Sequence, residues 1–97
     1  MSVWTHGRWT AKPGREEEFV AASRQLALTM REEVGAPLPT FLRDRDRPNV
    51  FLTFGRWESV EDIERFRAAA MPRIREIQPL LDAFEAFTLD EVGITPS

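Results

Sequence analysis

The sequence contains no cysteine, which excludes disulfide bonds, thiolate catalysis and thiolate metal sites. It contains one histidine, His6, and one lysine, Lys12. No apolar run approaches the roughly 20 residues that a transmembrane helix needs. The first residues also lack the basic and apolar regions of a secretion signal. We therefore expect a cytoplasmic protein that does not enter a membrane.

Strong charge of either sign is also missing. The net charge is -3 over 97 residues, and acidic and basic residues are mixed along the chain. This balance provides no basic patch for nucleic acid or an anionic membrane. One histidine and scattered carboxylates form no recognisable metal site, and the isolated glycines form no phosphate-binding loop. We expect one domain, residues 1–97, with no metal and no nucleic-acid partner.

What is present is an alternation of strand-like and helix-like segments. Runs rich in β-branched and aromatic residues predict strands over residues 3–10, 40–46, 50–57 and 84–92. Apolar residues recur every three or four positions over 15–34 and 60–77, which predicts two amphipathic helices. We expect Pro72 to kink or restart the second helix, and residues 93–97 to form a frayed tail.

This β-α-β-β-α-β order, with right-handed crossovers, predicts an α+β, ferredoxin-like fold with an antiparallel sheet and both helices on one face. The third strand is apolar on both faces, with Leu52 and Phe54 opposite Phe51 and Trp57. The helices can cover only one of these faces. The uncovered face predicts a homodimer in which two copies pack their sheet faces against each other. The alternative is a monomer that tolerates a few exposed aromatic residues.

Two segments resemble a known family. W-T-A-K-P-G-R-E-E-E-F at residues 9–19 and F-G-R-W-E-S-V-E-D-I at residues 54–63 are similar to parts of antibiotic biosynthesis monooxygenase (ABM) domains. The resemblance spans nearly the whole chain in element order and implies a dimeric α/β barrel with a pocket between sheet and helices. It also implies a monooxygenase that needs no cofactor and acts on a small aromatic, quinol or polyketide-like substrate.

The resemblance implies roles for three residues. Trp57 occupies the family's Trp position, which suggests a catalytic role; a core aromatic that closes the strand is the alternative. Phe66 stands where related domains often carry Trp or His, so it can line a substrate pocket, or simply pack in the core, but cannot move a proton. Gly7 stands where haem-degrading relatives carry Asn, which argues, with Phe66, against haem oxygenation.

His6 is the candidate general base, because its ordinary pKa lies near neutrality and a substrate phenol must lose a proton. Strand alternation, however, places His6 on the face opposite Thr5, Gly7 and Trp9. If those three residues face the helices, they line the substrate pocket and His6 points towards the dimer interface.

Two further functions stay open. A non-catalytic ligand-binding or sensing barrel would use the same pocket without turnover, and the scarcity of acids and bases near neutral pH favours it. An RNA-binding module shares the element order but would need aromatics within a basic sheet motif. Four arginines are weaker candidates for binding a phenolate, since each is more simply a solvated charge: Arg56, Arg67, Arg73 and Arg75.

Overall fold

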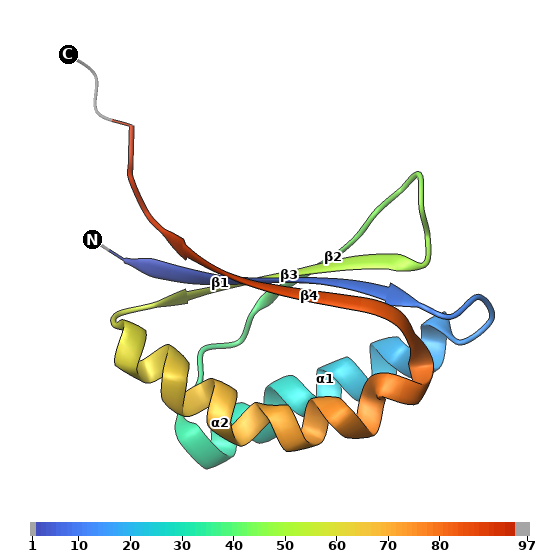
Figure 1. Ribbon diagram of the computed structural model, residues 1–97, viewed down its shortest axis with the longest axis horizontal. Helices are drawn as coiled ribbons and strands as arrows, with labels where there is room; N and C mark the ends of the chain where they lie inside the picture. The colour runs from blue at the N-terminus through green and yellow to red at the C-terminus, as the bar shows by residue number, and fades with distance from the viewer. Residues whose placement is uncertain (1, 95–97) are drawn as a thin grey trace.

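The fold is a four-stranded antiparallel sheet with two helices on one side. The computed structural model describes residues 2–94. Its elements are β1 (Val3–Ala11), α1 (Glu16–Val34), β2 (Thr40–Arg43), β3 (Val50–Trp57), α2 (Val60–Ile77), the short 3-10 helix η1 (Gln78–Leu80) and β4 (Leu81–Asp90). The strand order is β2-β3-β1-β4. Figure 1 shows both helices against one face of the sheet, with the opposite face uncovered. The predicted ferredoxin-like α+β fold is confirmed.

The helices begin and end where local chemistry favours it. Ser59 precedes α2, and its hydroxyl accepts a hydrogen bond from the Asp62 backbone N–H at 3.2 Å. Helix α1 opens with three glutamates, which complement the positive end of the helix dipole. It ends at Gly35, whose φ of 68° lies in the left-handed region. Both helices therefore keep the predicted limits to within a residue or two.

The predicted limits of two strands are wrong. Strand β2 ends at Arg43 rather than at residue 46, because the Asp44 carboxylate accepts hydrogen bonds from the backbone N–H groups of Asp46 and Arg47 and turns the chain. Strand β4 runs from Leu81 to Asp90 rather than over 84–92. It starts early because β1 pairs with it as far as Ala11, beyond a bulge.

The expected restart of the second helix at Pro72 is wrong. Helix α2 continues through this residue without interruption from Val60 to Ile77. Pro72 is exposed, so its ring points to solvent and not into the packed face of the helix. Of the expected frayed tail, residues 95–97 lie outside the described part of the chain.

The hydrophobic core lies between the sheet and the helices. Phe19 and Met30 of α1 and Ile63 of α2 are its most deeply buried large side chains. Phe19 packs on Phe51 of β3, with ring centroids 5.1 Å apart. Complete burial of each such side chain is worth about 1.5–3 kcal/mol. These buried side chains fix both helices against one face of the sheet.

The outer face of the sheet is apolar as well. Phe87 and Leu89 of β4 are each 41% exposed, and Leu42 of β2 is 47% exposed. His6 of β1 pairs with Phe54 of β3 and with Phe87, so these side chains share that face. The predicted two-faced sheet is therefore present in the single chain. No helix in residues 2–94 is long and apolar enough to cross a membrane.

Candidate functional site

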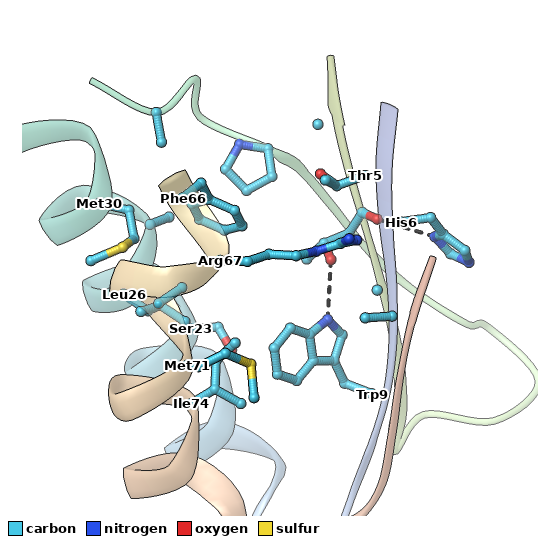
Figure 2. Close-up of a pocket in the computed structure, with 18 of the residues that line it drawn as sticks. Thr5, His6, Trp9, Ser23, Leu26, Met30, Phe66, Arg67, Met71 and Ile74 are labelled. Atoms are coloured by element: carbon cyan, nitrogen blue, oxygen red, sulfur yellow. Dashed lines mark hydrogen bonds between the residues drawn. The ribbon is translucent and has the colours of Figure 1, made fainter. Parts of the chain in front are cut away.

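A cavity of about 340 Å³ lies between the helix-facing side of the sheet and the two helices. Apolar side chains form most of its wall, and Figure 2 shows several of them around it. They include Leu26, Met30, Phe66, Met71, Ile74 and Phe84. Its size is at the lower end of the range for ligand pockets, about 300–1,000 Å³. The cavity therefore suits a small, largely apolar molecule.

Two tryptophans form hydrogen bonds with threonines in the cavity wall. The indole N–H of Trp9 donates to Thr53 Oγ1 at 3.1 Å. The indole N–H of Trp57 donates to Thr5 Oγ1 at 3.0 Å. Each bond joins β1 to β3, and both tryptophans are only 7% exposed. The polar end of each indole is thus satisfied while its apolar ring remains in the wall.

Two glycines make room for these indoles. A Cβ on Gly7 would lie 2.7 Å from both Thr53 Oγ1 and Trp9 Nε1. A Cβ on Gly55 would lie 2.9 Å from Thr5 Oγ1. Both distances are too short for a real Cβ, so a side chain at either position would displace the indole or the hydroxyl. Glycine is required here by close packing, and the φ angle plays no part.

The two sets of residues are related by the strand pairing itself. Gly7 lies opposite Thr53, and Thr5 lies opposite Gly55, in the antiparallel β1–β3 ladder. In each strand the tryptophan follows its glycine by two residues and so lies on the same face. The local two-fold symmetry of an antiparallel pair therefore produces the same Trp–Gly–Thr arrangement twice.

The structure brings together five of the six residues that the sequence suggested for the site. Thr5, Gly7, Trp9, Trp57 and Phe66 all line the cavity. The Phe66 ring packs against Trp57, with centroids 5.0 Å apart. Their roles in binding or catalysis stay predictions.

His6 contributes differently. Its backbone borders the cavity, but Figure 2 shows its ring on the far side of the strand. The ring stacks on Phe54 with centroids 4.3 Å apart, and its Nδ1 lies 3.1 Å from the carbonyl oxygen of Thr53. Because a carbonyl can only accept, this contact favours the tautomer with the proton on Nδ1. The structure therefore separates the imidazole from the other five predicted residues.

Two cavity residues were missed or undervalued by sequence reasoning. Thr53 was not selected, because its position opposite Gly7 depends on strand register. Arg67 was one of four arginine candidates, and among those four it is the one that lines the cavity. Its Nη1 donates to Thr88 Oγ1 at 2.7 Å and its Nη2 to the carbonyl oxygen of Phe87 at 3.1 Å. Helical spacing could have shown that Arg67 lies beside Phe66, but it could not have shown that the Arg67 side chain reaches β4.

The electrostatics of the cavity are simple. Within residues 2–94, Arg67 is the only permanently charged side chain in the wall, and no carboxylate lines it. A hydrogen bond from Arg15 lowers the pKa of Glu18, but this exposed pair lies outside the wall. No group of three or more acidic or histidine side chains in the described residues is placed to hold a metal ion. The wall therefore offers hydrogen-bond donors, one positive charge and aromatic surface.

These features define a ferredoxin-like domain with an apolar, ligand-sized cavity between its sheet and its helices. The family described as antibiotic biosynthesis monooxygenase matches residues 2–87, and the chain belongs to this family. The comparison with curated proteins found no match.

Solved structures of several bacterial proteins share the fold. A mutant of SnoaB, described as a cofactor-independent oxygenase from Streptomyces nogalater, has a TM-score of 0.82 at 21% identity, covering 99% of this chain and 98% of SnoaB. PA3566 from Pseudomonas aeruginosa has a TM-score of 0.78 at 21% identity, with 95% of each chain covered. Rv0793 from Mycobacterium tuberculosis has a TM-score of 0.81 at 15% identity, covering 99% of this chain and 100% of that one. At these identities the likeness establishes the fold alone.

Proposed function

We propose that this protein is a cofactor-independent monooxygenase of a small aromatic, quinol or polyketide-like compound. The observation that carries the proposal is the apolar cavity, whose wall combines aromatic rings with a few hydrogen-bond donors. Membership of the monooxygenase family and the shared fold with SnoaB, a cofactor-independent oxygenase, support the same reaction.

The proposed chemistry makes modest demands on the protein. An electron-rich substrate such as an anthrone loses a proton, and its anion passes electrons to dioxygen. One oxygen atom enters the substrate as a carbonyl and the other leaves as water, so the substrate supplies all the electrons. The cavity would orient the ring against Trp9, Trp57 and Phe66 and keep water away from the anion.

Oxygen uptake tests the proposal directly. The purified protein is mixed with anthrones, quinols and naphthols in the presence of a metal chelator and without added flavin. We expect oxygen consumption with at least one of them, and ¹⁸O₂ should place one labelled atom in the product. Binding without oxygen consumption across the panel would contradict the proposal.

That contrary result would support a second function, a ligand-binding or sensing domain. One observation favours it: in residues 2–94, no side chain with an ordinary pKa near neutrality points into the cavity, because the His6 ring lies across the sheet. A binding protein needs no such group, whereas an oxygenase without one depends on an acidic substrate or on Arg67 to promote ionisation.

We also propose that the protein forms a homodimer through the outer face of the sheet. Leu42, Phe87 and Leu89 expose 41–47% of their surface there, beside Phe54 and His6. A two-fold axis would place the same apolar residues of both copies against each other. Two sheets packed in this way would form the dimeric barrel that the family resemblance implies.

A further inference from the structure

Arg67 carries a positive charge that no acidic partner balances within residues 2–94. Its two hydrogen bonds go to neutral acceptors, Thr88 Oγ1 and the carbonyl oxygen of Phe87. Two other arginines of the same helix are paired with carboxylates, Arg65 with Asp62 and Arg73 with Glu33. A guanidinium has five N–H donors, so Arg67 keeps donors available beyond those two bonds.

Arg67 is also placed to act on a bound molecule. Figure 2 shows its side chain reaching from α2 across the cavity towards the strands, between Phe66 and Trp9. The residue is half-buried, and the surrounding wall is mainly apolar. A ligand in the cavity would displace water from this charge, and their electrostatic interaction would then be stronger than in water.

The two threonine hydroxyls add donors on the opposite wall. A hydroxyl has one proton to donate and two lone pairs to accept. At Thr5 and Thr53 an indole N–H already occupies an acceptor position, at 3.0 and 3.1 Å. Accepting that bond leaves the hydroxyl proton available for a ligand and polarises the O–H group towards donation.

We infer that the cavity binds its ligand as an oxyanion, with Arg67 as the counter-charge and the Thr5 and Thr53 hydroxyls as hydrogen-bond donors. The ligand class is therefore an acidic phenol or an enolised 1,3-dicarbonyl compound, bound as phenolate or enolate. A neutral ligand would not pair with the guanidinium charge, and a cationic ligand would be repelled by it. The inference rests on the same site as the proposed function and specifies the charge of its substrate.

The competing explanation is that Arg67 only ties α2 to the edge strand β4. That role needs no ligand and would not depend on ligand charge. The two explanations therefore differ in one measurable property, which is the preference of the cavity for an ionised ligand over its neutral form.

A chromophoric phenol measures this preference without any turnover. We would titrate the protein with 4-nitro-1-naphthol over a range of pH, because its phenol and phenolate forms absorb at different wavelengths. We expect the phenolate to bind at least about tenfold more tightly than the phenol, which lowers the apparent pKa of the bound probe by at least about one unit. The methyl ether of the same probe, which cannot ionise, serves as the neutral reference.

Variants assign the effect to the named residues. Arg67→Gln is expected to weaken phenolate binding by about tenfold while leaving the affinity for the ether nearly unchanged. Arg67→Lys should keep most of the phenolate preference because it keeps the charge. Arg75→Gln is the matched control, since Arg75 lies on the same helix, is exposed and does not line the cavity. Thr53→Val should weaken phenolate binding, and Thr53→Ser should restore it.

Equal binding of phenol and phenolate by the unmodified protein would overturn the inference, as would failure to bind either form. An equal loss of phenolate and ether affinity in Arg67→Gln would leave Arg67 with a structural role alone. Phenolate binding without oxygen uptake would refute the proposed oxygenase but keep this inference. Oxygen uptake by a protein that binds the phenol and the phenolate equally well would support the proposed oxygenase and refute this inference.

Discussion

The indole N–H of Trp57 donates to Thr5 Oγ1 across the backbone of Gly55, at 3.0 Å. The same relationship joins Trp9 to Thr53 across Gly7. Each arrangement needs three residues from two strands, and each presents an aromatic ring and a hydroxyl to one cavity. This part of the cavity wall, on the sheet side, is thus a direct product of the β1–β3 register.

Gly7→Ala should destabilise the protein by about 1–3 kcal/mol, because the new methyl group would lie 2.7 Å from Thr53 Oγ1 and Trp9 Nε1. Urea denaturation followed by tryptophan fluorescence measures this change. The double variant Gly7→Ala/Thr53→Ala should lose less stability than the sum of the two single variants, since removal of the hydroxyl relieves part of the clash. Strict additivity would show that the close approach to the Thr53 hydroxyl has no energetic importance.

Trp57→Phe should reduce turnover or ligand affinity by about tenfold, because the substrate loses part of the surface that orients it. His6→Ala should have less than about a twofold effect on either, since its ring lies across the sheet from the cavity. For both variants, turnover is measured by oxygen uptake and ligand affinity by probe titration. The protein concentration is kept high enough to preserve the oligomer. A large loss of turnover or ligand affinity in His6→Ala, with the oligomer preserved, would show that the imidazole takes part in the reaction or in binding.

Phe87→Glu should convert the proposed dimer to a monomer, because it places a carboxylate in an apolar interface. Light scattering at micromolar concentration measures the mass of each species. Leu28→Glu on α1 is the matched control, since Leu28 is 42% exposed and Phe87 is 41% exposed, yet they lie on opposite sides of the molecule. A monomeric mass for the unmodified protein would refute the dimer.

Pro72→Ala should stabilise the protein by about 1–3 kcal/mol, because it restores a helix-interior N–H donor and relieves the proline ring of its clash with the preceding turn. The residue is exposed, so no core contact is lost. Thermal and urea unfolding both measure the gain. A loss of stability would mean that the proline contributes a contact that outweighs its backbone cost.

Among the four arginine candidates, the structure distinguishes Arg67 from the other three, and the sequence interpretation did not. Arg67 and Arg75 are both arginines of α2, but Arg67 follows the buried Ile63 by four residues, so helical spacing places it beside the apolar face, whereas Arg75 lies off that face. One reaches across the cavity to the edge strand and the other is exposed. Helical spacing therefore separates the two arginines, but the hydrogen bonds of Arg67 to Thr88 and Phe87 depend on where β4 packs.

The amino-acid sequence by itself determined the element order, the helix limits, the two apolar faces of the sheet and the alternation that opposes His6 to Thr5, Gly7 and Trp9. These properties depend on local periodicity and capping, which a short window of residues contains. Only the tertiary structure decided that Thr53 lies opposite Gly7, that each indole reaches a threonine on the neighbouring strand, and that Arg67 reaches β4. Strand register and side-chain reach depend on how distant segments pack together. The two apolar faces of the sheet are therefore a consequence of local sequence, while the polar groups of the cavity are positioned by the fold.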